Sequence, residues 1–311
     1  MRVFPNPDYF NHPKLAPSAP AADKAARLEA LKTFLPAFDK ALAGWMDAGR
    51  PDFEARIGLG DEALRQVQAR GFALLSVERN AKAGILAEVA RDVQELEAGL
   101  QTIGKPKFRD MNRALERSDY PRLYELVQQA YEELGVFEIA SAYMRRPMRI
   151  KKLFVQLNNA RETAIRYGEI DEAGLPALKT NYWHIDSDIW PSIKAIMYLN
   201  EVGLDQGPLR YVAGSHRDAD AFEMVVRKTN DTLHLPTSQF LALPDELRMH
   251  ALFGPYLTGE EPEVPGLLER EVAVFGEGSD LILFDNNGVH RGGFVRSGSR
   301  QIIQTLFEAV P

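Results

Sequence analysis

The chain has 311 residues, of which 45% are hydrophobic and 26% charged, as in ordinary globular proteins of one large or two smaller domains. It contains no cysteine, which excludes disulfides, cysteine-ligated zinc, iron–sulfur clusters and thiol nucleophiles. The net charge of -7, with no prominent cluster of Lys and Arg, argues against a nucleic-acid-binding protein.

The first segment, residues 1–20, contains five prolines and no hydrophobic periodicity, which predicts an irregular arm. It lacks the continuous apolar stretch of a secretory signal. No other segment has the roughly 18 consecutive apolar residues that a membrane span needs. We therefore expect a cytoplasmic protein that binds neither membranes nor nucleic acid.

Helical periodicity dominates residues 21–148, which we predict to be a mainly helical support. Hydrophobic residues recur at steps of three and four in four segments: 21–48, 61–70, 81–100 and 120–142. Pro36 lies inside the first segment, so that segment is either one kinked helix or two helices. A short buried strand is predicted at 72–77, directly after Gly71.

The pattern changes to short strands and turns over residues 149–308. The predicted strands are 149–158, 180–186, 193–199, 209–212, 272–275, 281–284, 289–295 and 300–307. Many short strands separated by Gly, Pro and Asn favour a jelly roll over a βαβ sheet. Residues 216–268 read as a helical or irregular insertion, either a lid or substrate wall or only a cover for the sheet. The fold class predicted is α+β, a double-stranded β-helix (jelly-roll) core within a single domain of residues 21–311.

Two residues in the strand predicted at 180–186 have a spacing typical of metal ligands. His184 and Asp186 are two positions apart, so their side chains emerge on one face of a strand. With a later histidine they would form the two-histidine, one-carboxylate face of non-haem Fe(II) sites. His290, in a late strand flanked by glycines, is the candidate, whereas His216 follows Gly-Ser and reads as part of a structural turn. A purely structural His–Asp pair is the alternative interpretation.

Block by block, residues 60–308 resemble the phytanoyl-CoA dioxygenase-like family of Fe(II)/2-oxoglutarate oxygenases. The matching blocks are 64–77, 182–186, 206–216 and 278–285, followed by His290 and Arg300. One departure is Arg291-Gly292-Gly293, which replaces the more usual small polar residues after the distal histidine. The first 60 residues match no family pattern.

The resemblance implies that His184, Asp186 and His290 bind Fe(II) and that Arg300 binds the distal carboxylate of 2-oxoglutarate. Three protein ligands leave three positions on an octahedral ion, two for 2-oxoglutarate and one for O₂. The planar guanidinium suits a carboxylate because it donates two parallel hydrogen bonds. Arg296 is the competing arginine, but it lies beside a turn.

The carboxylate at position 186 bears on the reaction, because related halogenases carry a small residue there that leaves room for halide. The resemblance therefore implies hydroxylation of a C–H bond in a small-molecule metabolite, with release of succinate and CO₂, or another oxidation by the same oxidant, rather than halogenation. Strand periodicity assigns further contacts. The predicted cofactor contacts are Gln156, Tyr182 and Asn158. The same periodicity predicts Lys194 and Tyr198 as substrate contacts. Asp188 and Trp190 are predicted substrate contacts because they lie just past the predicted ligand strand.

Other chemistries have less support. Residues 186–188 form an Asp-x-Asp, a spacing also used by manganese-dependent glycosyltransferases, but those enzymes need an α/β nucleotide-binding domain. Motifs of serine hydrolases, P-loop NTPases and zincins do not occur in the sequence. The alternative that stays open is a non-catalytic jelly roll that binds a ligand at a vestigial or differently metallated site.

Overall fold

The computed structural model describes residues 61–102, 112–160, 186, 192–216, 268–276, 280–293 and 295–310. The elements in chain order are α2 (Asp61–Arg70), β1 (Phe72–Leu75), α3 (Arg79–Thr102), β2 (Asn112–Leu115), α4 (Pro121–Glu133), α5 (Val136–Met144), β3 (Met148–Asn159), β4 (Ile193–Tyr198), η5 (Leu204–Gln206), β5 (Leu209–Val212), β6 (Glu271–Val274), β7 (Leu281–Asp285), β8 (His290–Gly292) and β9 (Ser299–Ala309). The predicted arm, the helix at 21–48 and the interior of the insertion at 216–268 lie outside these residues.

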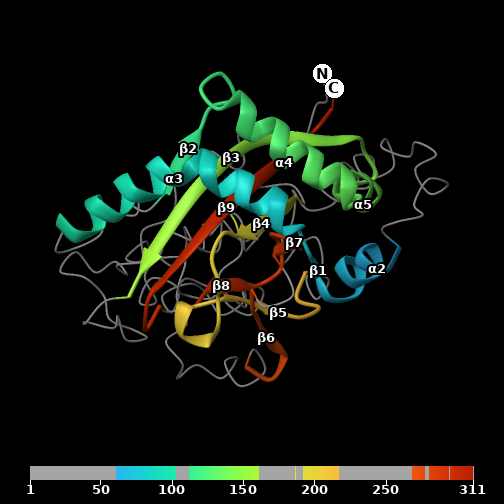
Figure 1. The fold of residues 1–311 in the computed structure, drawn as a ribbon. Helices are drawn as coiled ribbons and strands as arrows, with labels where there is room; N and C mark the ends of the chain where they lie inside the picture. Colours follow the sequence, from blue (N-terminus) through green and yellow to red (C-terminus); the bar gives the residue numbers. More distant parts are fainter. Residues whose placement is uncertain are drawn as a thin grey trace, which may run out of the picture.

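The strands form two sheets that face each other (Figure 1). The larger sheet has the order β1-β7-β4-β9-β3-β2, and the smaller has the order β6-β5-β8. Every pair of neighbouring strands is antiparallel. This arrangement brings strands that are far apart in the sequence, such as β4 and β9, side by side.

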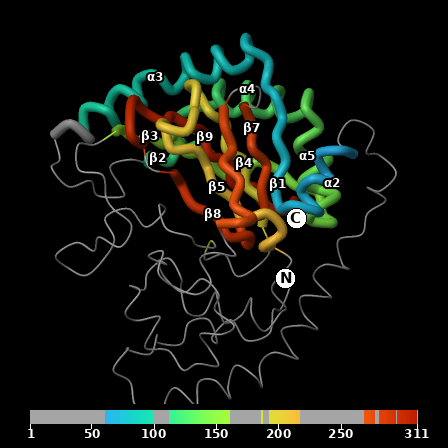
Figure 2. Tube along the Cα trace, turned by 90° about the horizontal axis from the view of Figure 1, so that it is seen from below, coloured from blue at the N-terminus to red at the C-terminus, as the bar shows by residue number. Residues whose placement is uncertain are grey.

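Helices α3, α4 and α5 cover the outer face of the larger sheet, opposite the smaller sheet (Figures 1 and 2). In β3, Leu153, Val155 and Leu157 are fully buried in the core under these helices. Because side chains alternate along a strand, the residues between them point to the other face. Gln156 and Asn158 are therefore aimed into the space between the two sheets, where they line a cavity.

A second hydrophobic core fills the space between the sheets, and Tyr198 stands at its centre. The Tyr198 hydroxyl donates to Val274 O on β6 at 3.0 Å. It also accepts a hydrogen bond from Leu209 N on β5 at 2.8 Å. One side chain of the larger sheet is thus hydrogen-bonded to two strands of the smaller sheet, which fixes the distance between them.

Most predicted elements in the described residues are confirmed, α2 and β5 with the predicted bounds. The single helix predicted at 120–142 is wrong: α4 and α5 are separate, because Gly135 between them has a left-handed φ of 67°. The prediction of only one strand before residue 148 is also wrong, since β2 pairs with β3. Within the described residues, no helix is long and apolar enough to cross a membrane.

Candidate metal and anion site

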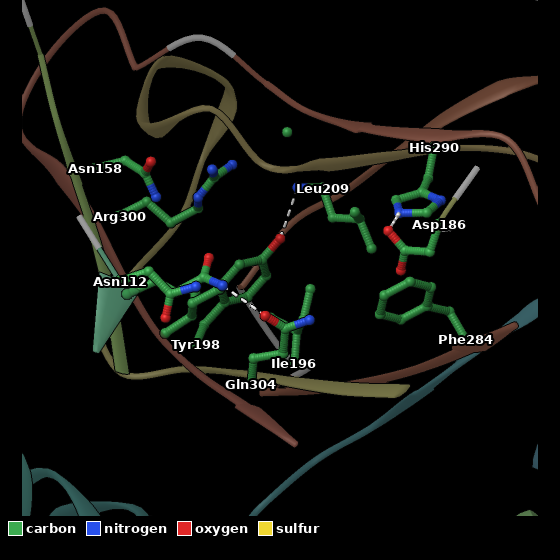
Figure 3. A pocket seen from close by; sticks show the side chains of 13 residues that line it. Asn112, Asn158, Asp186, Ile196, Tyr198, Leu209, Phe284, His290, Arg300 and Gln304 are labelled. Atoms are coloured by element: carbon green, nitrogen blue, oxygen red, sulfur yellow. Dashed lines mark hydrogen bonds and ion pairs between the residues drawn. The ribbon is translucent and has the colours of Figure 1, made fainter. Parts of the chain in front are cut away.

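A cavity of about 110 Å³ lies between the two sheets (Figure 3). It is lined by Asn112, Gln156, Asn158, Asp186, Ile196, Tyr198, Leu209, Phe284, His290, Gly292, Arg300, Ile302 and Gln304. On this scale one water needs roughly 10–15 Å³, so the cavity has room for a ligand of several atoms. Its polar residues gather at separate ends, with His290 and Asp186 at one and Arg300 and Asn158 at another (Figure 3).

Strand register explains why residues distant in sequence meet here. Asn158 of β3 lies directly opposite Arg300 of β9, and Gln156 lies opposite Ile302. Tyr198 of β4 pairs with Ile302 on the other side of β9. Alternate residues of three adjacent strands therefore share one face of the larger sheet, and that face is the cavity floor.

His290 begins β8, and its ring is held by a hydrogen bond between Nδ1 and Gly288 O at 2.8 Å. Because a carbonyl only accepts, Nδ1 carries the proton and the Nε2 lone pair faces Asp186. Burial lowers the pKa of His290, with nearby Asp186 opposing part of that shift. The neutral imidazole, which is the form that binds metals, is therefore favoured at neutral pH.

Asp186 lies beside His290, with its Oδ1 3.8 Å from His290 Nε2. This separation is too long for a hydrogen bond. It is shorter than the sum of two bonds from nitrogen and oxygen ligands to a metal ion, each about 2.0–2.2 Å, so one ion can contact both atoms. Asp186 N donates to Asn286 O at 3.0 Å, so the backbone fixes the position of this residue. Asp186 itself is not in a strand, so the strand predicted at 180–186 does not extend to its last residue.

The other oxygen of the Asp186 carboxylate, Oδ2, accepts a hydrogen bond from Lys194 Nζ. Both side chains are mostly buried, with exposed fractions of 16% and 13%. The predicted contact of Lys194 with substrate stays a prediction, and the structure places its ammonium group against the Asp186 carboxylate. This pairing leaves Oδ1 as the oxygen that faces His290.

Arg300 supplies a positive charge at the opposite end of the cavity. It is buried, and its Nη1 donates to Gly207 O. Among the described residues, its Nε has no hydrogen-bond partner and no carboxylate pairs with the guanidinium. Burial lowers the pKa of Arg300, which shows how poorly its charge is solvated. A buried guanidinium without a carboxylate partner makes this end of the cavity receptive to an anion.

The structure brings together seven of the predicted site residues: Asp186, His290, Arg300, Gln156, Asn158, Tyr198 and Lys194. The other four, His184, Tyr182, Asp188 and Trp190, lie outside the described residues. Within the described residues, no group of three His, Asp or Glu side chains could hold a metal ion. The roles assigned to all eleven stay predictions.

Tyr198 contributes its ring to the cavity, because its hydroxyl is bonded to backbone groups of β5 and β6. Burial raises its pKa to about 12, so the hydroxyl stays protonated at neutral pH. Among the polar side chains that line the cavity, the sequence did not predict two, Asn112 and Gln304. Gln304 follows from the period-two rule counted from Arg300, and it accepts a hydrogen bond from Gln156. Asn112 lies on β2, the strand that the sequence did not predict.

His216 does not line the cavity. Its Nε2 lies 3.3 Å from Gln68 O, at the end of α2. The preceding Ser215 accepts a hydrogen bond from Val289 N at 2.7 Å and donates to Val212 O at 2.7 Å. The Gly-Ser-His segment therefore binds the backbone next to His290, as expected of a structural turn.

No protein-family model matches the chain, and a search of curated proteins finds no similar sequence. Several solved structures are similar. AviO1 from Streptomyces viridochromogenes Tue57 is 18% identical over 81% of this chain and 96% of its own, with a TM-score of 0.47. The non-heme alpha ketoglutarate dependent carbocyclase SnoK from nogalamycin biosynthesis is 18% identical over 80% of this chain and 84% of its own, with a TM-score of 0.45. EctD from S. alaskensis is 16% identical over 80% of this chain and 76% of its own, with a TM-score of 0.49. Likenesses at this level do not establish a family for the chain.

Proposed function

We propose that this chain is an Fe(II)/2-oxoglutarate-dependent oxygenase that hydroxylates a C–H bond of a small-molecule metabolite. The observation that supports this proposal best is that the cavity has two chemically different ends. One end presents a neutral histidine beside a carboxylate, and another presents a buried arginine that pairs with no carboxylate among the described residues. 2-Oxoglutarate has matching ends, a keto acid that chelates a metal and a carboxylate that pairs with arginine.

The residues at the metal end fit Fe(II). His290 Nε2 and Asp186 Oδ1 are a nitrogen and an oxygen donor facing each other across 3.8 Å. His184 precedes Asp186 by two residues and would complete the three-ligand face. When bound together with O₂, Fe(II) and 2-oxoglutarate supply an oxidant for C–H bonds and release succinate and CO₂. The carboxylate at 186 fills a position that a halide would need, which favours hydroxylation.

Residues of this chain would orient the co-substrate. Arg300 would bind its distal carboxylate, with Asn158 opposite in the register and Gln156 and Tyr182 as further contacts. Phe284 and Leu209 line the cavity and reduce the access of water. Lys194 would keep the Asp186 carboxylate turned so that Oδ1 faces the metal. Asp188, Trp190 and the Tyr198 ring would contact the substrate.

We also propose a more specific fold for this chain. Two facing antiparallel sheets are compatible with a double-stranded β-helix over residues 149–308, in a single domain with helical support.

One observation favours a second candidate, a non-catalytic protein that binds a ligand in the same cavity. Lys194 already neutralises the Asp186 carboxylate, so this acid has a partner without any metal. Metal analysis of the purified protein distinguishes the two candidates. Protein that holds no metal and gains no affinity for 2-oxoglutarate after addition of Fe(II) or Mn(II) would favour the binding protein.

The oxygenase proposal is tested by measuring succinate. Protein incubated with Fe(II), ascorbate and 2-oxoglutarate, alone and with a panel of small metabolites, should form succinate. His184→Ala should abolish that formation because a metal ligand is lost. The matched control is His216→Gln, which changes a histidine that contacts α2 outside the cavity and should retain activity. If the wild type neither binds metal nor forms succinate with any compound, the oxygenase proposal is wrong.

A further inference from the structure

The turn that follows β7, residues 285–288, lies directly beside the candidate metal site. We call these four residues the ligand turn. It closes with a hydrogen bond from Gly288 N to Asp285 O at 3.2 Å. Its first residue is bound to the residue before β1, because Asp285 N donates to Gly71 O at 2.8 Å. The residue after it, Val289, is bound to Ser215 through its backbone N–H.

Two carbonyls of the ligand turn hold the two described metal-ligand candidates. Gly288 O accepts from His290 Nδ1 at 2.8 Å and so sets the orientation of the imidazole ring. Asn286 O accepts from Asp186 N at 3.0 Å and so sets the position of the carboxylate-bearing residue. A shift of this turn would therefore move both ligands, although they are 104 positions apart in the sequence.

The inside of the ligand turn is filled by Tyr211 of β5. Its hydroxyl donates to Asp285 O at 2.8 Å, and its ring stacks on His290 with centroids 6.2 Å apart. A Cβ at Gly288 would lie only 1.7 Å from the Tyr211 hydroxyl oxygen. Only glycine fits at that position, so the turn has little freedom to move inward.

The outside of the ligand turn is held by the Asp285 carboxylate, which is buried. Its Oδ1 accepts from Asn287 N at 2.7 Å and from Asn287 Nδ2 at 2.9 Å. Its Oδ2 accepts from the Tyr143 hydroxyl of α5. One carboxylate thus connects a helix on the outer face of the larger sheet to the turn that carries the site.

We infer that Asp285 and Tyr143 are positioning residues for the metal site: the Asp285 carboxylate fixes the ligand turn, and the turn fixes His290 and Asp186. This inference rests on the proposed function. It concerns groups that contact neither metal nor substrate, and it predicts that a helix residue on the far side of the larger sheet affects metal affinity. Loss of the hydrogen-bonding groups behind metal ligands typically weakens metal binding by about 10–100-fold.

The test is a titration with Mn(II), followed by EPR of the free ion, together with the melting temperature of each variant. Asp285→Asn keeps the shape of the side chain but replaces one of its two acceptor oxygens with an NH₂ group, so Asn287 and Tyr143 can no longer both donate to it. This change should weaken Mn(II) binding about tenfold. Tyr143→Phe should weaken it by a smaller factor. The matched control is Tyr131→Phe, because Tyr131 also hydrogen-bonds across to the larger sheet, at Thr305, but away from the site. It should lower the melting temperature and leave Mn(II) affinity unchanged.

The outcomes separate this inference from the proposed function. Wild type that binds Mn(II), with the same affinity in Asp285→Asn and Tyr143→Phe, overturns the inference and leaves the oxygenase proposal standing. Wild type that does not bind Mn(II) overturns the oxygenase proposal and this inference with it. If Asp285→Asn does not fold, the comparison of Tyr143→Phe with Tyr131→Phe decides: equal Mn(II) affinities for both count against the inference.

Discussion

Two arginines near the end of the chain differ in surroundings. Arg300 is buried in the cavity, whereas Arg296 is exposed four residues earlier. A charge is buried without compensation only at considerable cost, so the position of Arg300 is explained best by an anionic ligand. The contrast between these two side chains provides an internal control for the role of Arg300.

Arg300→Met should weaken 2-oxoglutarate binding because it removes the only guanidinium that lines the cavity within the described residues. Hydrogen bonds to charged groups contribute about 1.5–3 kcal/mol, which corresponds to about a 10–100-fold loss of affinity. Isothermal titration of 2-oxoglutarate into Mn(II)-loaded protein measures this change. Arg296→Met should bind like the wild type, and equal affinities for both variants would contradict the assignment.

At this scale the sequence predicts which residues share a face but not which atoms they bind. The period-two rule places Gln156, Asn158 and Tyr198 correctly on the cavity floor. It cannot show that Lys194 pairs with Asp186, because that contact joins β4 to a residue outside any strand. Neither can it show that the Tyr198 hydroxyl is bound to backbone groups, because those groups belong to the other sheet.

Among the elements, the connection between β7 and β8 has the tightest constraints. A Cβ on Gly288 would overlap the Tyr211 hydroxyl, whereas one on Gly84 of α3 would meet nothing closer than 3.5 Å. The two positions therefore differ in whether they have space for a side chain. Gly84 interrupts a helix at a position where alanine fits, and Gly288 makes room for a buried ring.

Gly288→Ala and Gly84→Ala should have opposite effects on the free energy of unfolding. Overpacking in a core costs about 1–3 kcal/mol, so Gly288→Ala should destabilise the protein by about that amount. Gly84→Ala should stabilise it by about 0.5–1 kcal/mol, since glycine is a poor helix residue. Urea denaturation of both variants measures the difference, and a neutral Gly288→Ala would show that the turn has more room than the structure gives it.

Errors of prediction at this scale have local physical causes. The hydrophobic pattern continues through 120–142 without a break in period, and only the left-handed Gly135 separates α4 from α5. Strand β2 is four residues long and contains Asn and Arg, so it shows neither alternation nor β-formers. It forms because it can pair with β3 at the edge of the sheet. A contact between distant segments of this kind cannot be seen in the local sequence.

For the molecule as a whole, the candidate site joins the two sheets. His290 belongs to the smaller sheet, and Arg300 belongs to the larger one. A ligand that binds both ends of the cavity would therefore add a connection between the sheets, parallel to that made by Tyr198. Such a ligand binds only the folded protein, so its affinity contributes directly to stability.

Mn(II) and 2-oxoglutarate together should therefore raise the melting temperature. Ligand at a hundred times its dissociation constant stabilises by about 2.7 kcal/mol. At about 2 °C per kcal/mol for a chain of this size, the rise should be about 5 °C. Differential scanning fluorimetry measures the rise in melting temperature. In Arg300→Met, the part of this rise that 2-oxoglutarate adds to that of Mn(II) should be lost. An unchanged melting temperature with both ligands present would contradict binding in this cavity.

From the sequence, hydrophobic periodicity predicted most of the strands and helices of the fold. Residue patterns predicted strands at 149–158, 193–199 and 300–307 and a mainly helical segment before them, and β3, β4 and β9 confirm the strands. The order of strands in the sheets could not be predicted in this way, because alternation identifies the two faces of a strand and not its neighbours. The position of Arg300 opposite Asn158 depends on that order and on the register of β3 with β9.

The hydrogen bond between Asp186 N and Asn286 O belongs to the main chain, so it does not depend on which side chain residue 186 carries. Position 186 can therefore change its side chain while the backbone stays in place. A small residue there would leave a gap beside His290, with the Lys194 ammonium group next to it. That gap, next to a positive charge, would have room for a small external anion such as chloride, which the Asp186 carboxylate keeps out of the wild-type site.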